Sequence, residues 1–237
     1  MKMKVFLSAL AGGALIAFPA QAELKGDSQA IALADQMIES IGGKAVWSKI
    51  RTLYVVEKSR TPTYGDGIIA EFWRDLLVPQ ERYSIQNENI SYTKSWTVGG
   101  GWTLRNGEFK TKSAEEVAAD EGYYWPGEIY IIYGRLARDD DTLRLEKGED
   151  PRSFVVYELA SGRKLSTFWL NVDGDMYRWR HGNESDLTEY VYGPHVDFGE
   201  ISFPAWGTMY DGSWSFSYVE VRGYTEDMEI DYTTQPE

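Results

Sequence analysis

DSQAIALADQMIESIGGKAVWSKIRTL, residues 27–53, is the stretch that decides how this chain folds. Ile31, Ala34, Ile38 and Ile41 recur at the spacing of one helix face, which predicts an amphipathic helix. Asp27 or Ser28 can cap its start. Gly42-Gly43 ends it, because glycine adopts the left-handed conformation without a steric penalty. Strand-like sequence begins at Leu53, so we expect the apolar face of this helix to lie against a sheet.

Residues 1–22 have the anatomy of a secretory signal peptide. Lys2 and Lys4 give a positive start, residues 5–18 form an apolar run, and Ala20-Gln21-Ala22 is a small-residue cleavage site. The run is short for a transmembrane helix, which needs about 20 apolar residues. We therefore expect cleavage after Ala22 and a periplasmic protein, with residues 23–237 as one domain.

Charge and cysteine content exclude several kinds of partner. The formal net charge is −13, and the chain has no cysteine. An acidic surface repels phosphate backbones, so nucleic acid is excluded as a partner. No later apolar run approaches spanning length, so we do not expect an integral membrane protein. Without disulfides, core packing must stabilise the fold.

From Thr52 onward the sequence is dominated by short β-branched and aromatic runs separated by turn-formers. We count about eleven strands, and Asn106-Gly107 predicts a tight hairpin. The pattern is interrupted by two predicted helices over residues 113–138. The first opens with a capping box, Ser113 with Glu116 three residues later. Helices in the middle of a sheet protein are expected to cover an edge, a face or a cavity mouth.

No catalytic or metal-binding constellation stands out. Two histidines, His181 and His195, are too few for a multi-histidine metal site, and structural zinc sites of the cysteine type are excluded. The GxSxG motif of a serine nucleophile is absent, and Asp139-Asp140-Asp141 lacks the spacing of an EF-hand calcium loop. We therefore predict no cofactor, no metal and no enzymatic activity. Paired carboxylates are not excluded, because separation in space is invisible in a sequence with 37 acidic residues.

The opening stretch also resembles a known family. ADQMIESIGGKAVWSKIRTLYV, with Gly42-Gly43, Trp47 and Leu53, resembles the start of the periplasmic outer-membrane lipoprotein-sorting proteins, the LolA/LolB-like family. Further similarities are the Gly101-Trp102 hairpin, the helical insertion after Lys112, FWLNVDGDMYR and the ISFPA segment at 201–205. The resemblance thus touches most of residues 23–237, in order.

The resemblance implies a curved, incomplete antiparallel β-barrel of about eleven strands, with an N-terminal helix and a mid-chain helical lid over the concave side. It also implies a carrier that holds a lipid or other hydrophobic ligand, such as an acyl chain of a lipoprotein, and that exchanges it with an envelope protein partner. The aromatic-rich sheet agrees with such a cavity. We expect its lining to be Phe72, Trp102, Ile129, Ile132, Tyr133, Phe168, Leu170, Trp214 and Phe216.

Two other functions fit the same sequence. A secreted carbohydrate-binding or carbohydrate-active protein would place several of its tryptophans together on an open surface, with a pair of carboxylates beside them. The directions in which Trp73, Trp96, Trp125, Trp179 and Trp206 point would distinguish such a surface from a cavity. A structural or envelope-assembly protein would instead have its concave face filled by its own helices.

Overall fold

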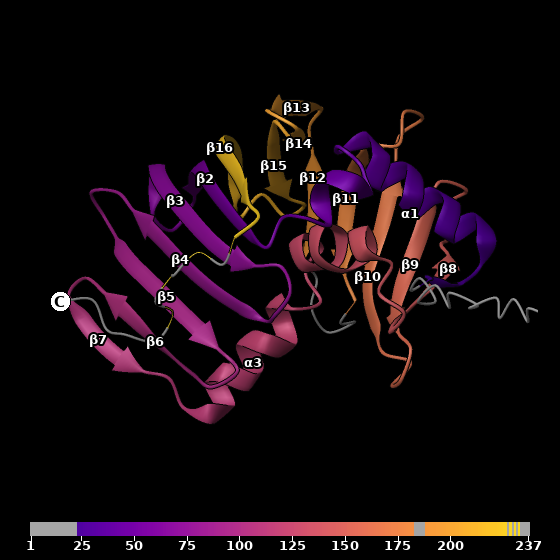
Figure 1. Ribbon diagram of the computed structural model, residues 1–237. Coiled ribbons are helices and arrows are strands. Elements are labelled where there is room, and N and C mark those ends of the chain that lie inside the picture. Colours follow the sequence, from indigo (N-terminus) through magenta and orange to yellow (C-terminus); the bar gives the residue numbers. More distant parts are fainter. Residues whose placement is uncertain (1–22, 183–187, 227, 229, 231, 233–237) are drawn as a thin grey trace, which may run out of the picture.

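The computed structural model describes residues 23–182, 188–226, 228, 230 and 232. The predicted signal peptide lies outside the described residues. The described part is mainly β, with a curved sheet in two halves and helices on its concave side (Figure 1). The expected fold class, a curved and incomplete antiparallel barrel with few helices, is confirmed.

The helices and strands follow one another along the chain in this order. The helices are α1 (Ser28–Ser40), α2 (Lys44–Trp47), α3 (Ala114–Tyr124), η1 (Tyr130–Arg135) and η2 (Leu136–Arg138). The earlier strands are β1 (Lys25–Gly26), β2 (Thr52–Thr61), β3 (Gly65–Asp75), β4 (Gln80–Gln86), β5 (Ser91–Thr97), β6 (Gly100–Arg105) and β7 (Glu108–Thr111). The later strands are β8 (Leu143–Lys147), β9 (Ser153–Glu158), β10 (Lys164–Leu170), β11 (Met176–His181), β12 (Glu189–Tyr192), β13 (His195–Phe198), β14 (Ile201–Pro204), β15 (Trp206–Met209) and β16 (Ser215–Tyr224).

Fourteen of these strands form one open sheet in the order β1-β8-β9-β10-β11-β12-β15-β16-β2-β3-β4-β5-β6-β7. Its neighbours are antiparallel, except that β1 runs parallel to β8. Strands β13 and β14 form a separate hairpin. The described part thus has more strands than the eleven expected, because strands of two to four residues such as β1, β13 and β14 are too short to show an alternating pattern.

Helix α1 lies on the right-hand half of the sheet in Figure 1, against β8 and β9. Asp27 is its N-cap and accepts from the backbone N–H groups of Gln29 and Ala30 at 2.9 and 3.1 Å. Gly42 and Gly43 follow with φ of 117° and 83°, a conformation that favours glycine. The local signals at both ends of this helix were therefore interpreted correctly.

Helix α3 begins at the predicted capping box. The Ser113 hydroxyl accepts from the Glu116 backbone N–H at 3.2 Å, and the Glu116 carboxylate accepts from the Ser113 backbone N–H at 2.8 Å. The helix packs on β5 and β6, and its last turn reaches the other half of the sheet, where Tyr123 stacks on His181. The α3 segment therefore bridges the two halves below the concave side.

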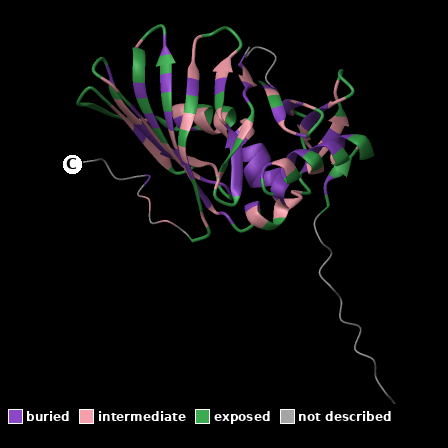
Figure 2. Ribbon diagram, turned by 90° about the horizontal axis from the view of Figure 1, so that it is seen from above, coloured by how far each residue is buried: buried purple, intermediate pink, exposed green. Residues whose placement is uncertain are grey.

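The helical segment after α3 is a plug rather than a lid. All six residues of η1 are buried, and Figure 2 shows the buried helix in the middle of the molecule. Gly134 lies so close to the loop after β3 that a Cβ there would be 2.6 Å from the Leu76 carbonyl oxygen. A helix that is buried on all sides must be fitted by the elements around it, because protein interiors are close-packed.

Two side chains connect this plug to the N-terminal segment. The ring of Trp47 lies 4.3 Å from that of Tyr133, and its indole N–H donates to the Ile41 carbonyl at 2.9 Å. The guanidinium of Arg138 donates to the carbonyls of Tyr133, Gly134 and Trp47 at 2.6, 2.8 and 3.0 Å, and also to that of Ile50. Arg138 thus donates to carbonyls at the ends of two short helices.

The Asn106-Gly107 hairpin joins β6 and β7 as predicted, with φ of 49° and 86° at the two residues. Within the described ranges, we find no helix with the length and apolar character required to cross a membrane.

The tight approach of η1 to the loop after β3 can be tested with one methyl group. Gly134→Ala should lower the free energy of unfolding by about 1–3 kcal/mol, because the added methyl forces backbone apart. Gly122→Ala, in α3 with open space around it, should leave stability unchanged or raise it by up to about 1 kcal/mol. Urea unfolding followed by tryptophan fluorescence measures both. Equal effects of the two substitutions would show that η1 is not confined.

Candidate functional site

A cavity remains beside the plug, on the concave side of the sheet, and both halves of the sheet contribute to its wall. Its volume is about 230 Å³. The wall comes from β2, β3, β4, β11, β12 and β16, and from the end of α3 with the turn that follows it. The lining residues are Val55, Glu57, Phe72, Arg74, Glu81, Tyr83, Tyr123, Tyr124, Gly127, Glu128, Ile129, Tyr130, Trp179, His181, Thr188, Tyr190, Trp214, Phe216 and Tyr218.

Strand alternation decides which side chains of β2 and β3 reach the cavity. Leu53, Val55 and Glu57 all face inward and are buried. Pairing sets Val55 opposite Phe72, and Phe72 opposite Tyr83, so an apolar and aromatic row crosses three strands. The next row along these strands carries Arg74 and Glu81. One wall of the cavity is therefore aromatic, with a charged pair at its border.

The charges of Arg74 and Glu81 compensate each other. Arg74 Nε lies 2.6 Å from a carboxylate oxygen of Glu81, and Lys94 Nζ lies 3.6 Å from the other. The Arg74 guanidinium also covers the ring of Phe72, 4.4 Å from its centre. Burial alone would raise the pKa of Glu81, but Arg74 and Lys94 hold it below its usual value. The pair is therefore ionised and compensated.

Glu57 differs from Glu81, because its pKa is raised rather than lowered. Its side chain is buried, and one carboxylate oxygen accepts from the Ser59 hydroxyl at 2.8 Å and from the Trp214 indole N–H at 3.3 Å. Burial raises the pKa of Glu57 to about 7, and these hydrogen bonds and the nearby Arg74 only partly oppose the rise. Glu57 therefore titrates near neutral pH.

Glu128 is the third carboxylate of the wall, after Glu57 and Glu81, and stands just before η1. Burial raises its pKa above the usual value, against the opposing charge of Arg74. Burial raises the pKa of Tyr190 and of Tyr192, and the charge of Glu128 raises both further. The cavity thus combines aromatic rings with two acidic groups whose charged forms are disfavoured by burial.

Four of the nine residues expected to line a cavity do so. Phe72 and Ile129 lie on opposite walls, and Trp214 and Phe216 enter from β16 and the turn before it. Whether they bind a ligand stays a prediction.

The other five lie elsewhere. Ile132, Tyr133, Phe168 and Leu170 are in the solid core, where Tyr133 stacks on Phe203 and Phe168 on Phe154. Trp102 points to the outer face, because the register places it in one row with Arg82 and Ser95, whose strand neighbours Glu81 and Lys94 face inward. The expected lining therefore corresponds to two regions, the cavity and the core around the plug.

Several polar members of the wall were missed: Glu57, Arg74, Glu81 and Glu128. For Glu57 and Arg74 a signal existed, because Leu53-Val55-Glu57 and Phe72-Arg74 alternate with outward-facing residues. Charged residues in a strand are usually solvated, so the pattern was outweighed by their polarity. Nothing in the sequence separated Glu128 from the other acidic residues of the helical insertion.

The tryptophans that a sugar surface would need do not share one face. Trp96 and Trp179 are buried on the inner side, and Trp125 lies against Tyr130, 5.0 Å between ring centres. Trp73 is on the outer face beside Tyr54, at 4.2 Å, and Trp206 is an exposed residue of β15. The five rings therefore form no single platform.

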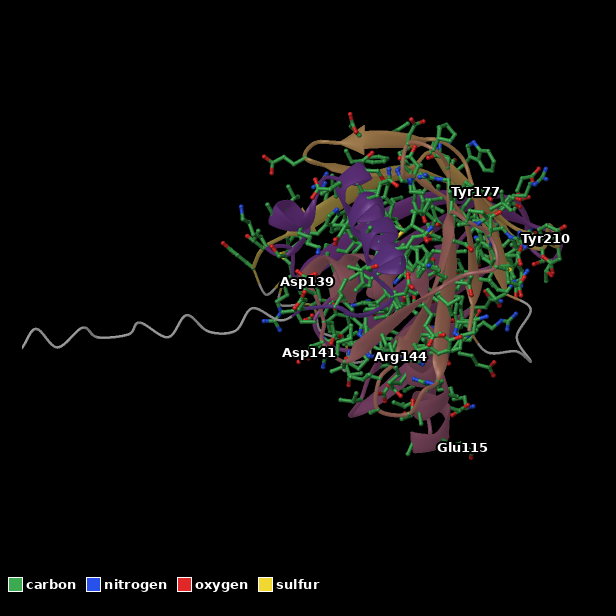
Figure 3. All side chains as sticks on the ribbon, turned by 90° about the vertical axis from the view of Figure 1, so that its right-hand side faces the viewer. Glu115, Asp139, Asp141, Arg144, Tyr177 and Tyr210 are labelled. Carbon is green, nitrogen blue, oxygen red and sulfur yellow. The ribbon has the colours of Figure 1, made fainter. Side chains whose placement is uncertain are left out.

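The remaining candidates for chemistry are held by structural contacts. His195 Nδ1 lies 3.1 Å from Asp175, and His181 stacks on Tyr123 in the cavity wall. Asp139 and Asp141 lie at the periphery (Figure 3), and Asp139 pairs with Lys44 at 2.6 Å. Among the described residues, no group of three or more acidic or histidine side chains is placed to hold a metal ion.

Comparison with known proteins gives likenesses of fold. No protein-family model matches the sequence, and no curated protein matches it. A DUF1329 family protein from Desulfovibrio piger has a TM-score of 0.47 and 9% identity, over 83% of this chain and 94% of that chain. A LolA superfamily protein from Nitrosomonas europaea has a TM-score of 0.47 and 11% identity, over 86% and 97%. An outer membrane lipoprotein-sorting protein domain from Vibrio parahaemolyticus has a TM-score of 0.39 and 9% identity, over 86% and 96%. The family that the opening stretch resembles therefore also occurs among the structural neighbours.

The buried acid gives the protein a measurable pH dependence. Unfolded Glu57 loses its proton near 4.5, whereas the folded protein keeps it to about 7. Its contribution to stability is thus complete below pH 4.5 and is lost as the pH rises to about 7, a change of about 3 kcal/mol. Glu57→Gln, which mimics the protonated acid, should lose less stability over this range in urea unfolding.

The matched control is Glu71→Gln, an exposed residue of the neighbouring strand β3. It should keep the pH dependence of the natural protein. If Glu57→Gln and Glu71→Gln show the same dependence, Glu57 is not protonated in the folded state.

Proposed function

We propose that this protein is a carrier that holds the hydrophobic part of an amphipathic ligand in the cavity between β2, β3, β4 and the turn after α3. The single observation that carries the proposal is a cavity of about 230 Å³ with a wall made largely of aromatic rings. Interiors are normally packed without such spaces. An apolar cavity with a few convergent polar groups is the usual form of a small-molecule site.

The size of the cavity limits what it holds. One water molecule takes about 30 Å³ of liquid, so there is room for a group of about eight heavy atoms. That suits one short chain, one end of a longer acyl chain, or a ring system. An acyl chain of a lipoprotein is within this class, and the volume favours one chain rather than several.

Burial of such a group supplies enough free energy for binding. Each methylene group removed from water contributes about 0.8 kcal/mol, so eight carbons give about 6 kcal/mol before the cost of ordering the ligand. The aromatic rings add contact area at little cost in side-chain entropy. No covalent step is needed for this role, and we propose binding without catalysis.

The proposed location is the periplasm. It rests on the signal-peptide pattern of residues 1–22 and on the absence of cysteine from a chain that must be stable outside the cytoplasm. The carrier role agrees with what the resemblance of the opening stretch implies, including an envelope protein that donates or receives the ligand.

Filling the cavity tests the proposal. Val55 faces the cavity from β2, so Val55→Trp should occupy it and weaken the binding of a hydrophobic dye such as phenylnaphthylamine by about tenfold or more, while overpacking costs about 1–3 kcal/mol of stability. Val56→Trp adds the same side chain to the opposite face and should leave dye binding as it is. Fluorescence titration measures both.

Two results would contradict the carrier. Dye binding that is equal in the two variants would place the site elsewhere. Displacement of the dye by simple sugars, but not by hydrophobic compounds, would instead support the carbohydrate-binding alternative. The observation that favours it is the presence in the cavity of Glu57 and Glu128, the two carboxylates that form no ion pair there with the described residues.

A further inference from the structure

The charges around the cavity fall into two groups. Arg74, Glu81 and Lys94 neutralise one another within 3.6 Å. Lys94 also lies 3.6 Å from the centre of the Tyr124 ring and 3.9 Å from Asp120, so both cations are fully engaged. The charges of this group are already compensated within the protein, so they are not available to a ligand.

Glu57 and Glu128 form the other group, and neither has a cation within ion-pair distance in the part of the chain that the structure describes. Only one oxygen of Glu57 accepts hydrogen bonds, from Ser59 and Trp214. Arg74 acts on both carboxylates only from a distance. Buried charges are normally paired, so the buried Glu57, with the half-buried Glu128 in the same wall, requires an explanation.

The two carboxylates face a common space. Burial is the main cause of the raised pKa values of Tyr218 and Tyr190. The charges of Glu57 and Glu128 add to the rise in both. Tyr192, 5% exposed, lies close enough to Glu128 to oppose part of the rise in its pKa. Carboxylates that converge on one cavity without a cation beside them are typical of a site whose ligand supplies the charge.

The surrounding rings favour positive charge. Trp214, Phe216 and Tyr218 alternate along one stretch and all line the cavity, with Tyr190 beside Phe216 at 5.9 Å between ring centres. Aromatic faces attract ammonium groups, most strongly when water is excluded. The net charge of −13 also raises the local concentration of cations and lowers that of anions.

We propose that the cavity takes a cationic amphiphile, an alkyl- or arylammonium compound, with its ammonium group between Glu57 and Glu128 and its apolar part against the rings of β16. This inference rests on the proposed function and adds the chemistry of the head group. An anionic head group, such as that of a fatty acid, would face two unpaired carboxylates, and the one nearby guanidinium is already held by Glu81.

Three eight-carbon compounds that differ only in head group test the proposal. Octyltrimethylammonium, octanol and octanoate each compete with phenylnaphthylamine for the natural protein at about pH 8, where Glu57 is mostly ionised. The ammonium compound should bind about tenfold more tightly than octanol, and octanoate should bind less tightly than octanol. Octanoate as the tightest ligand, or equal binding of all three, would overturn the proposal.

Substitutions locate the effect. Glu128→Gln should reduce the advantage of the ammonium compound over octanol about fivefold or more, because it removes one charge from the site. Glu71→Gln, on the outer face, should keep the full advantage. An unchanged advantage in Glu128→Gln would show that the cation binds elsewhere.

The outcomes for the two proposals are distinguishable. If octanol displaces the dye but the ammonium compound has no advantage, the carrier function stands and the cationic ligand is refuted. If none of the three compounds displaces the dye, both are refuted. The head-group comparison uses the natural protein, so it decides the matter even if a variant fails to fold.

Discussion

The guanidinium of Arg138 connects the two short helices η1 and α2 to the start of the sheet. It donates to carbonyls of η1, of α2 and of the segment that leads into β2, and so fixes the plug relative to the start of the sheet. Burial lowers its pKa only from a very high value, so the group stays charged. Because the plug is fixed at this end and confined at Gly134, it cannot slide to fill the whole concave side. The cavity is what remains.

The wall of that cavity is not arranged for maximum stability. Burying Glu57 without a cation, with the half-buried Glu128 in the same wall, costs free energy that apolar residues of similar size would not cost. The neighbouring Arg74 and Glu81 show that the same sheet can bury charges in a compensated pair. Groups whose pKa is displaced by burial in a cavity are candidates for function, and binding a cation would return the lost stabilisation.

Local signals were sufficient for the helix starts and the hairpin, and non-local pairing was needed for the short strands and the site. Asp27, Ser113 and Asn106-Gly107 act through neighbours in sequence, so the helix starts and the hairpin could be predicted. Phe72 and Phe168 have the same strand pattern, yet one faces the cavity and the other the core, because the plug covers only part of the concave face. The side of Trp102 depended on the register across the Gly99–Gly101 turn. Glu128 became visible only once η1 had brought it opposite β16.

The central claim is that ligands enter the cavity beside Glu57. The indole N–H of Trp214, 3.3 Å from that carboxylate, is its most direct reporter, and the exposed Trp206 on β15 is an internal control. Nitrogen-15 NMR of the tryptophan side chains during titration with octanol should shift the Trp214 signal and leave that of Trp206 in place. A Trp214 signal that does not move, or a shift confined to Trp206, would contradict the account.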